Sequence, residues 1–426
     1  MARFIIRGGN AISGTMQPVG NKNAALPMIA AALLTDEPVK LTNVPQIEDV
    51  RVMLDLLRGI GVEVAQRGGA VTLCAQKIDS CALDRELCTK VRSSILLAGP
   101  LAARRGEARL APPGGDVIGR RRLDSHFYAL QALGIDVQLG NDISFRRKKL
   151  AGAEILLDEA SVTATENAMM AAALASGKTV IYNAACEPHV QDLGMMLNKM
   201  GARIAGLGTN RIEIRGAKRL RGVTHRVGPD YIEIGSFLVA AAATGGSLDV
   251  ALGGDCKVWL PVVEKTFRTM GISWSVKKEK LHLPSRQERV IQSDAASDIP
   301  KIEDGIWPAF PSDLMSVAIV LATQLNGPVL FFEKLFESRM YFVDHLISMG
   351  ARIVQCDPHR VVVVGPSRLR AAHMSSPDIR AGMALLIAAL CARGASVIEN
   401  AQIIDRGYER IEEKLRALGA DITRVE

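Results

Sequence analysis

One sequence pattern recurs six times along the chain and limits the possible folds more than any other feature. Each copy joins an Ala- and Leu-rich stretch to a strand-like stretch, and then an amphipathic stretch to a glycine turn and another strand. Successive turns lie between 67 and 79 residues apart, a period too long for a solenoid and too regular for chance. We therefore predict six copies of one α/β unit. The turn glycines are Gly61, Gly134, Gly201, Gly271, Gly350 and Gly419.

The length of the chain predicts two domains. A chain of 426 residues exceeds what one hydrophobic core usually encloses. Six repeats divide evenly, so we predict a first lobe over residues 22–229 and a second lobe formed by residues 1–21 with 230–426. The strand-like segment 4–20 has no place in the first repeat, and we predict that it completes the sheet of the second lobe. Ligands often bind between domains, which makes a cleft between the lobes the default site.

Composition narrows the class of protein. Hydrophobic residues make up 48% and charged residues 23% of the chain, and no apolar run approaches the roughly 18 residues that a membrane span needs. The N-terminus shows no secretory signal, and seven scattered cysteines without a CxxC pair favour free thiols in a cytoplasmic protein. Lys and Arg number 52 against 45 Asp and Glu, which suits an anionic ligand. Aromatic residues, at 4%, are too few to favour a nucleic-acid partner.

The segment NKNAALP is a candidate anion site. Lys22 and Asn23 follow a turn at Gly20 and precede an apolar stretch that predicts a helix. A helix N-terminus attracts anions through its free N–H groups and its dipole, and an adjacent Lys adds a full charge. The alternative is a simple N-capping turn with a solvated Lys. The residues alone leave both interpretations open.

The segment APPGGDVIGRRR, residues 111–122, is the most unusual local stretch. Two prolines and two glycines indicate a loop, which contains Asp116 and is followed by Gly119 and three arginines, Arg120 to Arg122. Such a loop is typical of a mobile lid over an anionic substrate. A surface connection with a solvated basic run is the alternative.

Four segments of the second half place charged residues at predicted helix starts. In FPSDL, Asp313 is a candidate base or a simple helix cap. Arginines at corresponding edges of repeats are either structural ion pairs or part of a site that recognises phosphate and carboxylate groups. We find no Walker loop, GxGxxG after a strand, HExxH or GxSxG, so neither a metal nor an organic cofactor is expected. The further candidates are Arg339, Asp378, Arg380, Asp405 and Arg406.

Taken together, these segments resemble the enolpyruvyl transferase family, in its nucleotide-sugar branch rather than its shikimate branch. The resemblance is collinear from about residue 4 to residue 425. It implies a two-lobed inside-out α/β barrel of six repeated units, three in each lobe, with the 111–122 loop on the first lobe and the active site in the interlobe cleft. The matching segments are NKNAALP, PPGGDVIG, PDYIEIGSF, FPSDL, FESRM, PDIRAG and IDRGYERIEEKL.

The resemblance also implies a reaction. Members of this branch transfer the enolpyruvyl group of phosphoenolpyruvate (PEP) to the 3-hydroxyl of UDP-N-acetylglucosamine and release phosphate, which begins peptidoglycan synthesis. The expected partners are therefore two small-molecule substrates, with no nucleic acid and no membrane. The sequence leaves the oligomeric state open, and a monomer is compatible with it.

Residue roles follow from the same resemblance, position by position. Lys22, Arg92, Arg121 and Arg406 are expected to bind PEP. Lys22, Asp116, Asp313 and Arg406 are expected to be catalytic, with Asp313 as the base. The expected acceptor-binding residues are Asn23, Arg121, Arg122, Leu123, Asp124, Ser161, Val162, Thr163, Asp313, Arg339 and Asp378.

Several positions depart from the usual family pattern. Asp116 stands where the family commonly has the Cys that fosfomycin alkylates, so we expect resistance to this antibiotic. A free aspartic acid is ionised at neutral pH whereas a Cys thiol keeps its proton, so an acid role for Asp116 requires burial when the loop closes. Arg122 and Thr163 replace a usual Pro and Gly where the family binds uridine, which leaves open a paralogue with another acceptor or a non-catalytic nucleotide-sugar-binding relative. Tyr231 and Cys186 each replace a usual Arg.

Overall fold

The computed structural model describes residues 2–116, 118–254, 256–295 and 298–426. The described chain folds into two compact parts. We call residues 20–116 and 121–228 the first lobe, and the remaining described residues the second lobe. The predicted division placed all of the 111–122 loop in the first lobe, whereas residues 118–120 group with the second.

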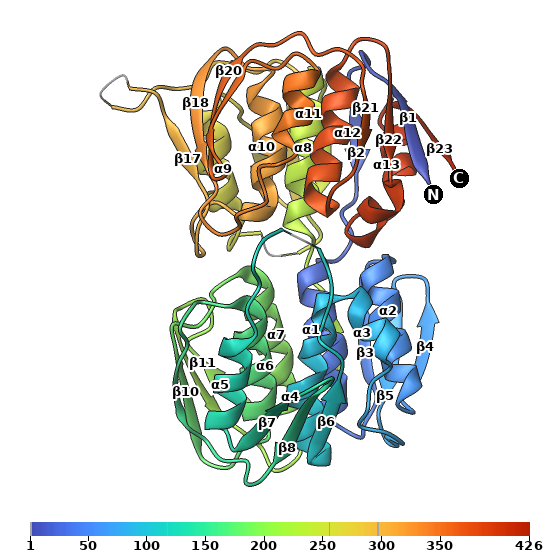
Figure 1. The fold of residues 1–426 in the computed structure, drawn as a ribbon, viewed down its shortest axis with the longest axis vertical. Helices are drawn as coiled ribbons and strands as arrows, with labels where there is room; N and C mark the ends of the chain where they lie inside the picture. Colours follow the sequence, from blue (N-terminus) through green and yellow to red (C-terminus); the bar gives the residue numbers. More distant parts are fainter. Residues whose placement is uncertain (1, 117, 255, 296–297) are drawn as a thin grey trace. The chain divides into compact units, whose positions relative to one another are not determined.

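Three repeats build the first lobe, each with inner and outer helices and a sheet (Figure 1). Repeat one contains α1 (Lys22–Ala31), η1 (Ala32–Leu34), β3 (Val39–Thr42), α2 (Glu48–Gly59), β4 (Glu63–Arg67) and β5 (Ala70–Cys74). Repeat two contains α3 (Arg85–Lys90), η2 (Arg92–Leu97), α4 (Ala98–Arg105), β6 (Glu107–Leu110), α5 (Asp124–Ala132), β7 (Ile135–Leu139) and β8 (Ile143–Arg147). Repeat three contains β9 (Glu154–Leu156), α6 (Val162–Ala172), β10 (Lys178–Tyr182), α7 (Pro188–Met200), β11 (Arg203–Ala205) and β12 (Arg211–Arg215), and β13 (Val223–Arg226) returns to the sheet of repeat one.

The second lobe repeats this plan with strands from both ends of the chain. Repeat four contains β2 (Gly14–Met16), α8 (Tyr231–Thr244), β14 (Leu248–Ala251), α9 (Leu260–Thr269), β15 (Ser275–Lys277) and β16 (Lys280–Leu283). Repeat five contains β17 (Lys301–Glu303), α10 (Ser312–Ala322), β18 (Gly327–Phe332), α11 (Val343–Ser348), β19 (Ile353–Asp357) and β20 (Arg360–Gly365). Repeat six contains β1 (Arg3–Arg7), β21 (His373–Ser375), α12 (Ile379–Cys391), β22 (Ala395–Glu399), η3 (Ala401–Arg406), α13 (Ile411–Ala417) and β23 (Asp421–Val425).

The N-terminal segment supplies strands to two sheets of the second lobe. β1 lies between β22 and β23, antiparallel to both, so that Phe4 pairs with Ile398 on one side and with Arg424 on the other. β2 pairs in parallel with β14. Figure 1 shows the blue strand β1 among the red strands of the C-terminal repeat.

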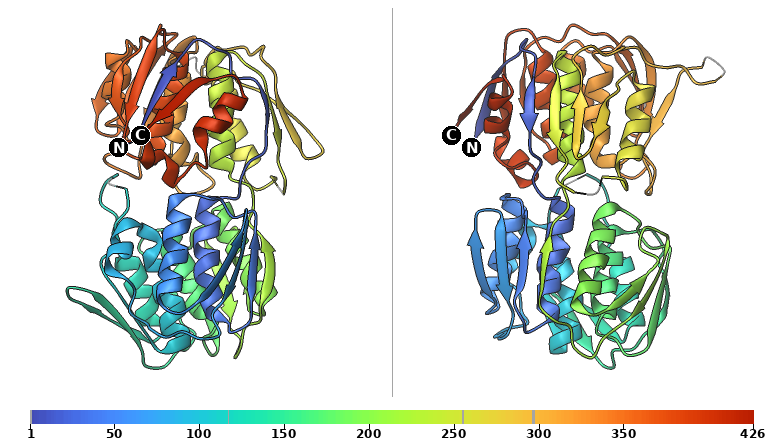
Figure 2. Two further views of the ribbon diagram at one scale, coloured as in Figure 1. Left: turned by 90° about the vertical axis from the view of Figure 1, so that its right-hand side faces the viewer. Right: turned by 180° about the vertical axis from the view of Figure 1, so that it is seen from behind.

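Apolar helices form the centre of each lobe, with the sheets outside them (Figure 2). In the second lobe α8, α10 and α12 pack against one another. Every residue of α8 from Tyr231 to Ala243 is buried, as expected for a helix that is apolar on all sides. The structure thus confirms the predicted six-repeat α/β fold, with helices inside and sheets outside in each lobe.

The turn glycines explain why the repeats share one sequence pattern. All six adopt positive φ angles between 69° and 113°, a region that is strained for residues with a Cβ. At Gly134 an added Cβ would also lie 2.0 Å from the carbonyl oxygen of Lys149. Each repeat therefore requires glycine where its outer helix ends and the next strand begins.

All seven cysteines are free thiols. Among the described residues, no helix combines the length and the apolar character needed to cross a membrane.

Candidate active-site residues

Three inner helices of the first lobe begin at residues predicted to bind substrate. α1 begins at Lys22, η2 begins at Arg92 and leads into α4, and α6 follows its N-cap Ser161. The helices contact one another, and the segments at their C-terminal ends line one common cavity. They therefore run in the same direction, and their N-termini share the opposite end of the bundle. Three helix N-termini, two of which begin with a basic residue, favour anions there.

Lys22 is held by a buried ion pair that the sequence analysis did not identify. Its Nζ lies 2.7 Å from Oδ2 of Asp49, which is in the first turn of α2, and both side chains are buried. The side chain of Asn21 caps α1 by accepting a hydrogen bond from the Ala24 N–H. Asp49 gave no signal in the sequence, because an acidic residue in a first helical turn is ordinary. Asn23 is half-buried.

Arg92 connects η2 to the basic segment that follows the loop. Its Nη2 donates hydrogen bonds to the carbonyl oxygens of Arg121 and Arg122, at 2.5 Å and 3.0 Å. Burial, and then repulsion from the Arg121 guanidinium, lower the pKa of Arg92 to about 10. Two cations are therefore held close enough to repel each other, which a bound anion would relieve.

The glycines of the loop allow close backbone approach to this region. A Cβ at Gly114 would lie 1.7 Å from the carbonyl oxygen of Thr89, and one at Gly115, where φ is +110°, would lie 3.0 Å from Cβ of Arg92. The next residue, Asp116, is half-buried. Residue 117 lies outside the described part of the chain, and that the loop is a mobile lid stays a prediction.

The far side of the loop contacts the segment that leads to Arg339. The backbone N–H of Arg120 donates to Oε2 of Glu337 at 3.2 Å, and the Ser338 N–H donates to the carbonyl oxygen of Ile118 at 3.1 Å. At Gly119 an added Cβ would lie 2.1 Å from Oε2 of Glu337. These contacts explain why residues 118–120 group with the second lobe.

Thr163, in the segment expected to bind uridine, hydrogen-bonds a buried histidine. Its Oγ1 lies 3.0 Å from Nε2 of His126, whose Nδ1 lies 3.2 Å from Nδ2 of Asn167. Burial, and then repulsion from Arg92, lower the pKa of His126 to about 3, so the ring is neutral. Since the Asn167 amide donates to Nδ1, the His126 proton is on Nε2 and is donated to Thr163.

The remaining first-lobe candidates are more exposed. Arg122 and Asp124 form an exposed ion pair, with 3.0 Å between Nε and Oδ2. The side-chain hydrogen bond to Asp124 raises the pKa of Arg122. Leu123 and Val162 are half-buried.

In the second lobe, Asp313 lies between two buried arginines. Arg339 Nη2 donates to its Oδ1 at 3.1 Å, and Arg380 Nη2 donates to its Oδ2 at 2.9 Å. Asp378 caps α12 by accepting from the Arg380 and Ala381 N–H groups, and its Oδ1 lies 3.8 Å from Arg339 Nη1. The structure therefore brings together three predicted residues of this lobe.

Both arginines have donors left over. Arg339 Nε and Arg380 Nη1 are buried and have no hydrogen-bond partner among the described residues. Buried donors without acceptors are rare and costly, so such groups beside a carboxylate suit a ligand with oxygen acceptors. Sequence reasoning named Arg380 but gave it no role.

Tyr408 supports Arg380 from behind. The guanidinium of Arg380 lies 5.4 Å from the centre of the Tyr408 ring, and the Tyr408 hydroxyl is 2.9 Å from Ser236 Oγ. Tyr408 is fully buried and was not predicted as a site residue. Arg406, two residues earlier, ends η3 and is half-buried.

A buried carboxyl pair orders the segment before Arg339. Glu333 accepts hydrogen bonds from Ser312 Oγ, at 2.9 Å and 3.0 Å to its two oxygens, and from the Leu335 and Phe336 N–H groups, each at 3.2 Å. Burial, together with the neighbouring Asp304 carboxyl, raises the pKa of Glu333 to about 9. This pair therefore fixes the start of α10, where Asp313 lies.

Two departures from the family pattern have local explanations. Tyr231 is buried, with its ring centre 6.0 Å from those of Trp259 and Trp307. Cys186 is buried and lies 3.4 Å from the carbonyl oxygen of Ala184. Both residues therefore pack within their own lobes. No cluster of three or more potential metal-ligating side chains occurs among the described residues.

Comparison with known proteins gives consistent matches over the whole chain. The family model for EPSP synthase (3-phosphoshikimate 1-carboxyvinyltransferase) matches residues 6–415. A UDP-N-acetylglucosamine 1-carboxyvinyltransferase of Bradyrhizobium diazoefficiens is 54% identical over 99% of this chain and 98% of its own. The protein of that name from Treponema denticola is 52% identical over 99% of both chains.

Solved structures support the same fold. The enolpyruvyl transferase NikO from Streptomyces tendae has a TM-score of 0.88 at 23% identity, covering 100% of this chain and 99% of its own. An EPSP synthase from Acinetobacter baumannii has a TM-score of 0.78 at 19% identity, covering 100% of both chains. These two likenesses concern the fold alone. Since the family model and the relatives above 50% identity each span nearly the full length, the chain belongs to the enolpyruvyl transferase family, in the group of the UDP-N-acetylglucosamine 1-carboxyvinyltransferases.

Proposed function

We propose that this transferase moves the enolpyruvyl group of PEP onto the 3-hydroxyl of UDP-N-acetylglucosamine and releases phosphate. The observation that carries this proposal is the 52–54% identity, over both lobes, to relatives with that named activity. The geometry agrees with it, because a half-buried carboxylate, Asp313, and cationic helix N-termini supply a base and binding groups for anions.

The reaction begins with two proton transfers. Asp116 donates a proton to the methylene carbon of PEP, which leaves positive charge on the central carbon. The acceptor hydroxyl oxygen then bonds to that carbon while Asp313 takes the hydroxyl proton. Arg339 and Arg380 hold the two oxygens of Asp313 and so fix its orientation.

The second half of the reaction restores the double bond. The new methyl group returns a proton to the Asp116 carboxylate, the bond from the central carbon to the phosphate oxygen breaks, and inorganic phosphate leaves with the proton that Asp313 had taken. The phosphate and carboxylate of PEP are neutralised by four cations: Lys22, Arg92, Arg121 and Arg406. This neutralisation lowers the energy barrier more than the proton transfers do, because the charge of the reacting molecule is concentrated on these two groups.

The acceptor is bound by the groups around α5 and α6. Ser161, Val162 and Thr163 begin α6 and bind the diphosphate or the uridine, with Thr163 oriented by His126. Arg122, Leu123 and Asp124 begin α5 and face the nucleotide. Asn23, Asp313, Arg339 and Asp378 bind the sugar. We place the enzyme in the cytoplasm, where free thiols such as its seven cysteines persist.

The test measures phosphate release from PEP with different acceptors. UDP-N-acetylglucosamine should give turnover, whereas UMP and shikimate 3-phosphate should give none above background. Turnover with another acceptor alone would assign the chain to a different enolpyruvyl transferase. Nucleotide-sugar binding without phosphate release from any acceptor would mean that the chain is not catalytic.

A further inference from the structure

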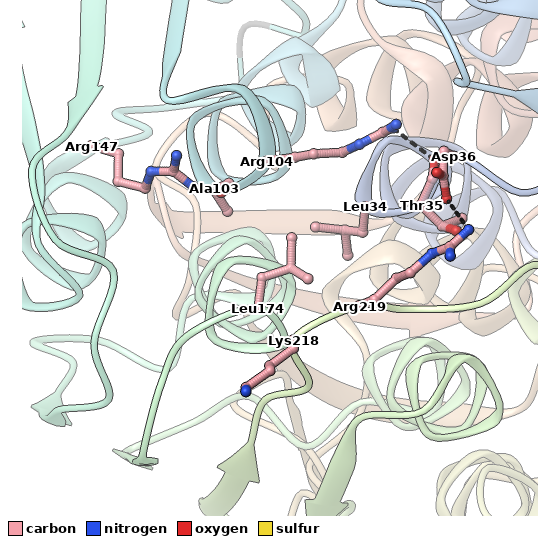
Figure 3. A pocket seen from close by; sticks show the side chains of 9 residues that line it. All are labelled: Leu34, Thr35, Asp36, Ala103, Arg104, Arg147, Leu174, Lys218 and Arg219. Carbon is pink, nitrogen blue, oxygen red and sulfur yellow. Dashed lines mark hydrogen bonds and ion pairs between the residues drawn. The ribbon is translucent and has the colours of Figure 1, made fainter.

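A cavity of about 330 Å³ lies at the C-terminal ends of the three inner helices of the first lobe (Figure 3). All three repeats of the lobe contribute to it, and none of the proposed substrate-binding residues lines it. One water molecule occupies ~30 Å³ in the liquid, so the cavity has room for about ten waters. This is more space than a single inorganic ion fills. The lining residues are Leu34, Thr35, Asp36, Ala103, Arg104, Arg147, Leu174, Lys218 and Arg219.

The lining combines positive charge with an apolar centre. Four side chains are cationic, and Asp36 is the single carboxylate among the lining residues. In Figure 3, Leu34 and Leu174 lie between the charged groups, near Ala103. Six of the nine lining residues are polar or charged and three are apolar, so a ligand here is held mainly by its charge and has a small apolar surface to cover.

The arginines have structural roles that use only part of their donor capacity. Arg104 Nη1 donates to the carbonyl oxygens of Leu33 and Thr35, at 3.0 Å and 2.7 Å, and Arg147 Nη1 donates to that of Ala103 at 2.5 Å. These bonds satisfy carbonyl groups at helix ends. Each guanidinium carries five N–H donors, and the other nitrogens of both side chains form no hydrogen bond with any described residue.

Arg219 and Lys218 complete the positive rim. Arg219 Nη2 lies 3.0 Å from Asp36 Oδ1 and 3.3 Å from Glu37 Oε1. Lys218 is exposed and forms neither an ion pair nor a hydrogen bond within the described chain. Burial lowers the pKa of Arg104, and the nearby Asp36 carboxylate partly opposes this shift.

We propose that this cavity binds a small organic anion, in which a phosphate or carboxylate group is attached to an apolar or planar body. The charged group contacts Lys218 and the unused arginine donors, and the body covers the two leucines. A bare phosphate ion would leave the apolar centre exposed to water, and a neutral apolar molecule would leave the cations without a counter-ion.

The cavity is joined to the proposed active site by the same three helices. α1 and η1 run from Lys22 to Leu34, and a helix of that length spans about 20 Å. α6 likewise separates Ser161 from Leu174, and η2 with α4 separates Arg92 from Arg104. A ligand that contacts all three helix ends is placed to act as an effector of the proposed active site. This consequence rests on the proposed function.

Binding is tested by calorimetry on the full chain with phenyl phosphate as the probe, in the presence of saturating PEP. We expect phenyl phosphate to bind at least tenfold more tightly than inorganic phosphate or benzyl alcohol. Lys218→Glu and the milder Lys218→Ala should each weaken it by at least tenfold. Lys280→Glu makes the same charge change at an exposed position of the second lobe, and should leave the affinity unchanged.

The proposal would be overturned by the absence of phenyl phosphate binding, or by equal affinity in the wild type and in both Lys218 variants. Equally tight binding of inorganic phosphate would also contradict it, because the apolar centre would then have no role. The calorimetric result is independent of turnover, so failure of the proposed function would appear only as missing phosphate release. Effector action predicts that phenyl phosphate changes the rate of the wild type but not that of Lys218→Glu.

Discussion

At the scale of single residues, the second lobe holds both oxygens of one carboxylate, Asp313, by hydrogen bonds. Asp313 is bound through both oxygens by arginines that are themselves buried, and each of these lies over an aromatic ring. A proton acceptor held in this way is already oriented, so little reorganisation is needed during the reaction. The opposite case is Asp116, which lies half-buried in a glycine-rich loop.

Replacement of Asp116 tests its role as the proton donor. Asp116→Asn should lower kcat by at least a hundredfold, because an amide has no acidic proton to donate. The wild type should keep full activity after prolonged exposure to fosfomycin, and Asp116→Cys should be active but inactivated with time. Steady-state kinetics and mass spectrometry of the treated protein measure both effects. Near-normal turnover of Asp116→Asn would remove this residue from the mechanism.

Tyr408 provides a test of positioning through Arg380. Tyr408→Phe keeps the ring below the guanidinium and loses the hydroxyl, which hydrogen-bonds Ser236 and also interacts with Arg380, so kcat should stay within about threefold while stability falls by about 1 kcal/mol. Tyr408→Leu removes the ring, and kcat should fall at least tenfold with little change in the KM for PEP. Equal kcat values for the two variants would show that the ring does not orient Arg380.

At the scale of elements, buried titratable groups hold helix starts in place. His126 connects α5 to the first turn of α6, and Glu333 connects the end of β18 to the start of α10. Both groups are neutral in the folded protein near pH 7, because burial disfavours their charged forms. Each therefore links the stability of its lobe to pH, in opposite directions.

His126 should make the protein sensitive to acid. Its pKa is about 3 when folded and near 6.5 when unfolded, so the unfolded chain binds more protons between these values. The free energy of unfolding therefore falls as pH drops from 6.5 towards 3, by up to about 1.4 kcal/mol for each pH unit. Urea unfolding between pH 7.5 and 5 should show a smaller slope for His126→Gln. His282→Gln, at an exposed histidine, serves as the control and should keep the wild-type slope.

Glu333 should make the stability of the protein fall as the pH rises above neutral. Its folded pKa of about 9 lies above the ordinary value of 4.5, so its contribution to stability is complete below pH 4.5 and is lost as pH rises through 9. Between pH 7 and 9 we expect the free energy of unfolding to fall in the wild type. Glu333→Gln keeps an acceptor for Ser312 and should flatten this dependence. An unchanged slope would mean that the buried carboxyl pair does not share a proton.

At the scale of the whole molecule, the sequence predicted the architecture better than the side-chain partners. The six glycine turns could be found in the sequence because each adopts a positive φ angle. This local constraint favours glycine, which can be recognised directly in the sequence. The partners of the candidate residues could not be found in this way. Asp49 pairs with Lys22, and Tyr408 lies against Arg380, because separate segments meet in space. Such pairs have no fixed spacing, and each member looks ordinary in its own segment.

The position of β1 between β22 and β23 has a consequence for biosynthesis. β23 is translated after every other described strand and pairs with β1, so this sheet cannot be finished until β23 has left the ribosome. The first lobe needs no strand beyond residue 226 and can fold in the meantime. A nascent chain stopped before β23 would present a bare strand edge, open to pairing with other chains.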